Sequence, residues 1–308
     1  MTTKEKLQFI LKLSGLNQAK LATRLGVTFV ALNRWINEKA TPRKSALLKI
    51  DELYKEYSGE KIIPENVLEA KRVIILTKRK SHKNILKEII DNPDIRDQFY
   101  LSLTYNTNSI EGSTLSKDDT AAVIFHNTAL PNKSLVEQLE AKNHQAALEY
   151  LMRHLVDKKP LSEKFILKLH GILLNSIRSD AGNYRNHGVR IMGTYVPTAN
   201  FAKIGALMKK LIRKINQKNS NMIKHIADIH SQFEKIHPFG DGNGRVSRLL
   251  MQAMSIKANL APVIILQEKK RLYYTYLNKA QIEDDLSLLE DFVCDAINSG
   301  YEIIERNL

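Results

Sequence analysis

The segment from His237 to Arg248 gathers residue types that can bind and activate a phosphate compound, in the order HPFGDGNGRVSR. Loop glycines let the main chain approach a ligand closely, and the helix expected to follow presents unpaired N–H groups and the positive end of its dipole. Arg245 and Arg248 are three residues apart, so both guanidinium groups can hold further phosphates from the same side. The segment therefore predicts an anion site that is best suited to phosphate.

Two further side chains in this segment could take part in a reaction. Asp241 supplies a hard oxygen ligand for Mg²⁺, which normally accompanies polyphosphate, and His237 titrates near neutral pH and can act as a general base. A plain turn between helices is the alternative interpretation, because Asp-Gly and Asn-Gly are turn dipeptides. A P-loop is excluded, because Gly240 is not followed at the right spacing by Gly-Lys-Ser/Thr.

The same segment fills every fixed position of the Fic motif HxFx(D/E)GNGRxxR, and the chain resembles Fic-domain proteins over about residues 100 to 300. The resemblance implies a protein adenylyltransferase, which transfers AMP from ATP to a Tyr, Thr or Ser hydroxyl of a target protein or of the enzyme itself. It also implies that His237 takes the proton from that hydroxyl and that Asp241 holds the Mg²⁺ cofactor. Phosphotransferring members carry Lys where this chain has Gly244, which favours nucleotide transfer.

The resemblance also indicates which residues surround the ATP co-substrate. Tyr273, Tyr274 and Gln281 resemble the adenine-side positions, although aromatic residues at helical spacing equally fit a packed core. His230 lies seven residues before His237 and is expected to pack behind it rather than to catalyse. The expected ATP-binding residues are Gly240, Asp241, Gly242, Asn243, Gly244, Arg245, Arg248, Tyr274 and Gln281.

A second pattern, from Thr107 through Glu111 to Gly112, fits the Fic inhibitory motif (S/T)xxxE(G/N). A carboxylate of Glu111 paired with Arg248 would occupy a guanidinium group that should hold the γ-phosphate, so that bound ATP would be misplaced for attack on its α-phosphate. Because Glu111 precedes the catalytic segment, the chain resembles the class with an N-terminal inhibitory helix. In some family members the same glutamate supports AMP removal, so a predominantly AMP-removing enzyme remains an alternative. A helix-capping glutamate beside a buried isoleucine would be the purely structural interpretation.

Alternation and glycines between residues 182 and 199 predict a short β-hairpin in a chain that is otherwise helical. Within it, Ile191, Gly193, Tyr195 and Val196 match the target flap of the family. An exposed strand edge there could add the target peptide as a further strand and place its hydroxyl before the catalytic histidine. An ordinary surface hairpin is the alternative.

The first sixty residues read as short helices, with Asn17 as an N-cap and Gly26 as a helix end. Two short helices joined by a tight glycine turn are the sequence form of a helix-turn-helix, and the stretch from residue 17 to 35 resembles the phage-repressor class of DNA-binding domains. That resemblance places one residue at the DNA backbone and three at the groove, namely Gln18 and then Thr28, Asn33 and Arg34. A helical cap used for protein contacts is the alternative, and a DNA-binding regulator with the Fic domain as a sensor or self-modifying switch is the competing function.

These patterns predict a mainly α chain with a helix-turn-helix domain at 1–60, a basic helical connector at 61–95, and a Fic-type helical domain with a β-hairpin flap at 96–308 that includes the inhibitory motif at 107–112. The stretch 71–87 holds seven Lys or Arg and no acid, which indicates either a solvated helix face or auxiliary anion binding.

The net charge of +14 calls for an anionic partner, either nucleic acid or phosphate, but does not choose between them. A single cysteine cannot form an internal disulfide, and no apolar run reaches the ~18 residues that span a bilayer. We therefore expect a cytoplasmic protein without membrane contact, and the sequence leaves open whether it forms a homo-oligomer.

Overall fold

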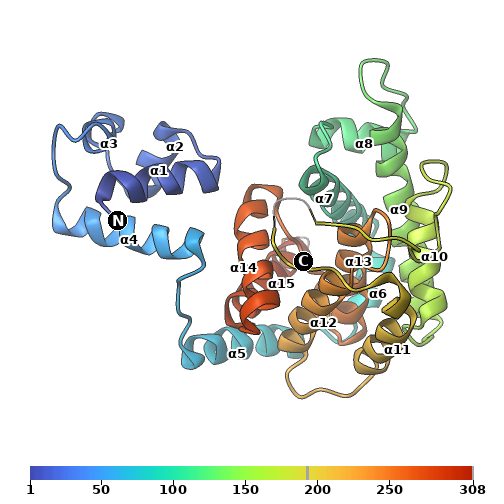
Figure 1. The fold of residues 1–308 in the computed structure, drawn as a ribbon. Coiled ribbons are helices and arrows are strands. Elements are labelled where there is room, and N and C mark those ends of the chain that lie inside the picture. The colour runs from blue at the N-terminus through green and yellow to red at the C-terminus, as the bar shows by residue number, and fades with distance from the viewer. Residues whose placement is uncertain (192–193, 307–308) are drawn as a thin grey trace.

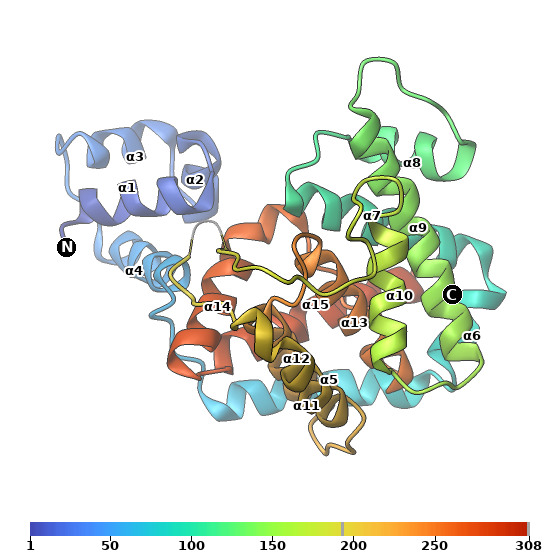
Figure 2. The same ribbon diagram turned by 45° about the vertical axis from the view of Figure 1, so that its right-hand side comes forward.

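The structure is a computed structural model that describes residues 1–191 and 194–306, and those residues form helices and loops with no strand among them. A small helical domain stands at the N-terminus, apart from a larger helical body (Figures 1 and 2). Its helices are α1 (Thr3–Ser14), α2 (Gln18–Leu25), α3 (Phe29–Ile36) and α4 (Lys44–Ser58).

The predicted helix boundaries of this small domain are confirmed. The side chain of Asn17 accepts a hydrogen bond from the Lys20 amide at 2.9 Å, and Gly26 ends α2 with a φ of 71°. The Thr28 hydroxyl caps α3 by accepting from the Ala31 amide at 3.2 Å. These local contacts fix the tight turn between α2 and α3.

The basic connector is part of the larger body, because α5 (Glu65–Ser81) packs along α15 (Ser287–Glu305). Lys71 lies 2.6 Å from Asp291 and 2.7 Å from Asp295, and Arg72 lies 2.9 Å from the buried Glu290. For these two cations both sequence interpretations, a solvated face and an anion site, are wrong. They neutralise acids that stand more than two hundred positions later in the chain.

The larger body is built around α13 (Asn243–Lys257), whose residues from Val246 to Ile256 are all buried. The helices that pack most against α13 precede it in the sequence, and α12 (Met222–Ile236) does so most extensively. The remaining helices of this body are α6 (Ile85–Asp91), α7 (Pro93–Glu111), α8 (Lys117–His126), α9 (Leu135–Val156), α10 (Glu163–Leu173), α11 (Ile204–Ile215) and α14 (Lys270–Glu283).

The expected β-hairpin is wrong for the described residues, since 182–191 and 194–199 contain no strand. A β-hairpin would need a ladder of main-chain hydrogen bonds, but side chains bind the main chain of this segment instead. The Thr198 hydroxyl donates to the Val189 carbonyl at 2.7 Å, and the Arg185 guanidinium donates to the carbonyl oxygens of His187 and Ala199, at 2.6 Å each. Gly193 lies outside the described residues. None of the described helices has the length and apolar content needed to cross a membrane.

Candidate active site

A cavity of about 570 Å³ opens where the loop between α12 and α13 meets the end of α7, the segment around residue 191, and α14. It brings together residues that are up to 171 positions apart in the chain. Of the residues singled out from the sequence, it is lined by Glu111, Ile191, His237, Gly240, Asp241, Gly242, Asn243, Gly244, Tyr273, Tyr274 and Gln281.

His237 ends α12 in a left-handed conformation, with a φ of 51°. Its Nδ1 lies 3.2 Å from the carbonyl oxygen of Glu234, which can only accept a hydrogen bond. Nδ1 is therefore assigned the proton, and Nε2 keeps its lone pair. Burial lowers the pKa of His237, the neighbouring Arg185 lowers it further, and the contact with Glu234 opposes both effects. The ring is thus held neutral and able to accept a proton.

Arg185 positions the main chain at His237, although no sequence pattern singled it out. Its guanidinium group is buried, and Nε donates to the carbonyl oxygen of His237 at 2.7 Å. Because the same group also binds two carbonyls of the 187–199 segment, it ties that segment to the end of α12. No motif spacing marks this arginine, since its partners are all main-chain atoms.

The glycine loop is held rigid by the side chain of Asn243. Its Oδ1 accepts from the Phe239 amide and its Nδ2 donates to the Phe239 carbonyl, both at 2.9 Å. The fully buried Phe239 ring stacks on His170 with centroids 3.8 Å apart and planes inclined by 6°. His170 Nε2 also donates to the Asp241 carbonyl at 3.1 Å. The loop is therefore fixed before any ligand arrives, which is what phosphate binding by main-chain amides requires.

Arg248 is almost completely buried and forms an ion pair with Glu111, the last residue of α7. Its Nε donates to the Thr107 hydroxyl at 2.7 Å, so Thr107 and Glu111, one turn apart, hold the same guanidinium group. Burial alone would lower the pKa of Arg248, but the charge of Glu111 raises it overall. The contact that the inhibitory motif predicts between Glu111 and Arg248 is therefore present.

Gly244 brings the glycine loop against this ion pair. A Cβ atom at Gly244 would lie 2.5 Å from Glu111 Oε1 and 3.0 Å from Arg248 Nη1, so a side chain there would displace one of them. Arg245, by contrast, forms an ion pair with Glu140 of α9 and lies 3.8 Å from Asp241 Oδ1. Both arginines that were expected to hold phosphates are thus paired with carboxylates in this structure.

Residues 160–255 match the model of the Fic/DOC family, and residues 7–61 match a helix-turn-helix family model. The chain contains a Fic domain. Relatives named protein adenylyltransferase Fic include those of Drosophila ananassae, 31% identical over 212 residues, and Drosophila virilis, 30% identical over 243 residues. The matches cover 68% and 77% of this chain but 42% and 49% of those relatives, so the chain spans less than half their length.

Solved structures share the fold of the whole chain or of its larger body. Fic-1 from C. elegans matches 99% of this chain and 99% of the solved chain, with a TM-score of 0.68 and 21% identity. A Fic domain containing signaling protein from Bacteroides thetaiotaomicron matches 77% of this chain and 98% of its own, with a TM-score of 0.67 and 24% identity. These likenesses establish the fold.

Glu234 is a cavity residue of the Fic domain that sequence analysis missed. Its side chain is 9% exposed, Oε2 lies 3.7 Å from His237 Nδ1, and Oε1 has no hydrogen-bond partner among the described residues. Burial, reinforced by Glu111, raises the pKa of Glu234 to about 7, against an opposing effect of Arg248. Its position one helical turn before His237 was the available signal, but a glutamate there equally fits an exposed helix face.

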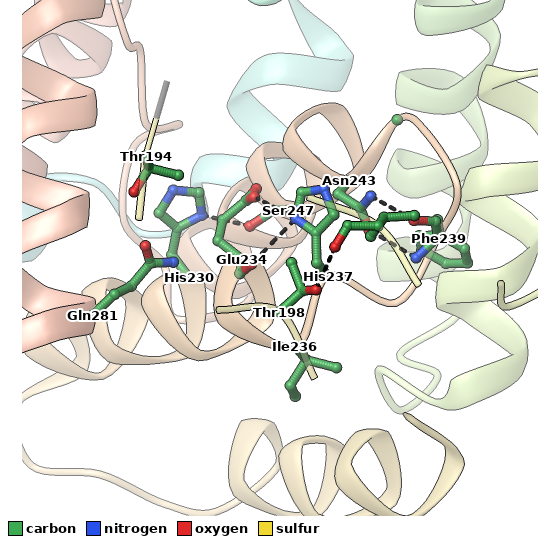
Figure 3. Close-up of polar contacts among 12 residues, drawn as sticks. Thr194, Thr198, His230, Glu234, Ile236, His237, Phe239, Asn243, Ser247 and Gln281 are labelled. Carbon is green, nitrogen blue, oxygen red and sulfur yellow. Dashed lines mark hydrogen bonds and ion pairs between the residues drawn. The ribbon is translucent and has the colours of Figure 1, made fainter. Parts of the chain in front are cut away.

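A buried polar chain on the α12 side of the cavity includes His230 and Ser247, and Figure 3 draws the contact between these two residues. His230 Nε2 is 2.8 Å from the Tyr273 hydroxyl, and His230 Nδ1 is 2.5 Å from the Ser247 hydroxyl. Burial lowers the pKa of His230 to about 3, which keeps it neutral. The expected packing role of His230 is therefore confirmed, and Tyr273 belongs to this chain of contacts.

The adenine-side and flap residues divide between cavity and surface. Tyr274 and Gln281 line the cavity, and Gln281 also donates to the Ser231 carbonyl at 3.2 Å. In the flap segment Ile191 lines the cavity, whereas Tyr195 is fully exposed and Val196 is buried. The cavity therefore receives one of the three flap residues that the structure describes.

Asp241 fits a magnesium ion only if the ligand brings further oxygens. Its carboxylate is half exposed, lines the cavity and accepts the Gly242 amide at 2.6 Å. Among the residues described, no group of three or more His, Cys, Asp or Glu could hold a metal. Mg²⁺ commonly binds through one or two carboxylates plus substrate phosphates and water, so a single carboxylate suits Mg²⁺ that arrives with a nucleotide.

The predicted DNA-contacting residues lie in the small domain, away from this cavity. Gln18 and Asn33 hydrogen-bond to each other at 3.3 Å and so join α2 to α3. Thr28 uses its hydroxyl to cap α3, and Arg34 is exposed. Arg34 is thus the member of the set whose side chain is exposed and not engaged in a cap or an inter-helix contact.

The raised pKa of Glu234 predicts a pH-dependent stability cost. Between its ordinary value near 4.5 and about 7 the folded chain binds a proton that the unfolded chain releases, so folded stability falls as pH rises through that window. The free energy of unfolding of Glu234→Gln minus that of the unsubstituted chain should therefore rise by on the order of 1–3 kcal/mol from pH 5 to pH 8. Urea denaturation at both pH values measures the gain.

The matched control is Asp228→Asn, which removes a carboxylate from the same helix, where Asp228 pairs with Lys214. Its effect on stability should be alike at the two pH values. If the Glu234→Gln difference also stays constant from pH 5 to pH 8, Glu234 does not titrate in this window and the argument fails.

Proposed function

We propose that this chain is a protein adenylyltransferase that transfers AMP from ATP to a Tyr, Thr or Ser hydroxyl of a target protein or of itself. The observation that carries the proposal is the placement of a neutral His237, with Nε2 unprotonated, beside a rigid loop at the N-terminus of α13. The names of the relatives support AMP transfer as the reaction. The geometry of the cavity supports the residue roles proposed below.

In this proposal the target hydroxyl attacks the α-phosphate of ATP as His237 Nε2 takes its proton, and pyrophosphate leaves. The main-chain amides of Gly242, Asn243 and Gly244 stabilise charge on the phosphate oxygens. The two hydrogen bonds between the Asn243 side chain and the main chain of Phe239 hold these amides in place before ATP binds. Tyr274 and Gln281 form the wall on the adenine side. Asp241 would hold Mg²⁺, which would neutralise phosphate charge.

In the same proposal Glu111 is an inhibitory residue. The Arg248 guanidinium group lies beside Gly244 of the loop, and Glu111 holds it from the cavity side. A γ-phosphate would need the same donors, so it competes with Glu111 for Arg248. While Glu111 keeps Arg248, the α-phosphate of bound ATP is not in line with the attacking hydroxyl, and the protein transfers AMP slowly.

Replacing Glu111 with glycine should raise AMP incorporation by roughly 10–100-fold, since charge-assisted hydrogen bonds from the freed Arg248 contribute about 1.5–3 kcal/mol. The measurement is incorporation from α-labelled ATP·Mg²⁺, followed by mass spectrometry. Adding His237→Ala to the glycine variant should abolish the label, because no base remains.

The matched control is Glu305→Gly, because Glu305 ends α15 as Glu111 ends α7 but pairs with Lys78 instead. It should incorporate no more label than the unsubstituted chain. Equal labelling of Glu111→Gly and the control would contradict inhibition by Glu111. Label that survives His237→Ala would contradict the proposed role of His237 as the base. Release of AMP from labelled protein that requires Glu111 would identify an AMP-removing enzyme.

The helix-turn-helix match supports a second candidate function, a DNA-binding regulator whose Fic domain senses or modifies. Arg34 is exposed, and arginine is the residue that most often reads guanine by two hydrogen bonds. The small domain is only modestly basic, with 11 basic and 6 acidic residues in the first sixty. We infer that any DNA affinity is moderate and depends strongly on salt.

Arg34→Ala should weaken binding to DNA enriched from a random-sequence pool by roughly 5–100-fold, as loss of one bidentate base contact predicts. Lys20→Ala, which removes another exposed cation of this domain, should cost less and do so equally for all sequences. Gel-shift titration at low salt measures both. Failure of the unsubstituted chain to retain any DNA would eliminate the regulator.

A further inference from the structure

Helix α14 presents three faces with three different surroundings. One face lines the cavity, with Lys270, Tyr274, Leu277, Asn278 and Gln281. A second face, with Leu272, Tyr276 and Ala280, is buried, and the Tyr276 ring contacts Phe292 of α15. The third carries Arg271, Thr275 and Lys279, which are spaced four residues apart and therefore stack along one side of the helix.

This third face holds the helix-turn-helix domain at two points. Arg271 Nη1 donates to the Lys12 carbonyl at 2.6 Å, and Lys279 Nζ donates to the Gly59 carbonyl, also at 2.6 Å. Lys12 lies in the last turn of α1, and Gly59 directly follows α4. Carbonyl groups at a helix C-terminus lack hydrogen-bond partners within the helix and lie at the negative end of its dipole. Each cation therefore donates to an unpaired carbonyl and is also attracted by the dipole.

Two glycines let the domains approach this closely. A Cβ atom at Gly15 would lie 3.4 Å from Arg271 Nε, and one at Gly59 would lie 3.3 Å from Thr275 Cγ2. Both residues have positive φ, 67° and 77°, where glycine is favoured. The turns that end α1 and α4 are therefore shaped to meet α14.

We propose that the helix-turn-helix domain is a support for the adenine-side wall of the cavity, and that its docking through Arg271 and Lys279 and nucleotide binding strengthen each other. The inference rests on the proposed nucleotide site. Helix α14 is a single rigid element, so fixing its outer side also fixes the side chains of Tyr274 and Gln281 on its inner side. Coupling of this kind is reciprocal: a bound nucleotide stabilises the docked domain by the same factor.

The surface expected to face DNA stays open in this arrangement. Helix α3 lies farther from α14 than α1 and α4 do, as both ribbon views show (Figures 1 and 2). A ligand of α3 that shifts the small domain against α14 therefore changes the nucleotide site without entering it. The small domain thereby becomes a regulatory input to the Fic domain.

The test is the affinity of the full-length chain for α,β-methylene-ATP·Mg²⁺, which binds as ATP does but cannot transfer AMP, measured by calorimetry. Arg271→Ala combined with Lys279→Ala should raise Kd by about 5-fold or more, the lower end of typical coupling. Arg271→Lys combined with Lys279→Arg keeps both donors and should restore Kd to within about 2-fold. The control, Lys4→Ala with Lys6→Ala, removes two cations that pair with Glu38 and Asp51 inside the small domain, and should leave Kd unchanged.

Hydrogen exchange supplies a readout that does not depend on activity. Nucleotide should slow exchange of the main-chain amides at 13–16 and 60–62 in the unsubstituted chain and not in the double alanine variant. If that variant does not fold, the two single substitutions replace it. An unchanged Kd in a folded variant overturns the inference and leaves the proposed function standing, whereas an unsubstituted chain that binds no nucleotide overturns both.

Discussion

A buried guanidinium group needs an anion beside it, and much of this structure follows from that need at Arg248. The side chain is 5% exposed, and its Nη1 has no hydrogen-bond partner among the described residues. Removing one partner of a buried ion pair typically costs 3–5 kcal/mol, because the other charge remains in a poorly solvating interior. The site is therefore stable with either Glu111 or a phosphate at this position. In the proposed function an internal carboxylate would occupy the position of a substrate anion, which supplies a physical basis for the proposed autoinhibition.

The catalytic loop has the opposite character, because it does not depend on an exchangeable partner. Asn243 closes both main-chain hydrogen bonds of Phe239, whose ring is stacked on His170, while Arg185 fixes the carbonyl of His237 from the other side. In the proposed mechanism the rigid loop holds the phosphate-binding amides in place, and the exchangeable ion pair between Glu111 and Arg248 would control when ATP can lie in line for attack.

Residues in the motifs could be predicted because their roles depend on near neighbours. The cap at Asn17, the helix end at Gly26, the start of α13 after the glycine loop, and the i, i+4 spacing of Thr107 and Glu111 are set within one helical turn. The hairpin was wrong for the opposite reason. Alternation predicts a strand only if a partner strand is present, and here Arg185 and Thr198 bind the main chain instead.

Short-range features could be predicted from the amino-acid sequence alone: helix ends, a glycine loop with a histidine at its entrance, and a glutamate spaced to meet an arginine. The charge environment of the site and the contacts between the two domains became visible only in the folded chain. Glu234 has a raised pKa because it is buried, Lys71 and Arg72 face acids of α15, and α14 joins the small domain to the cavity. Each of these depends on residues far apart in the chain, and burial and long-range pairing arise only when the helices pack.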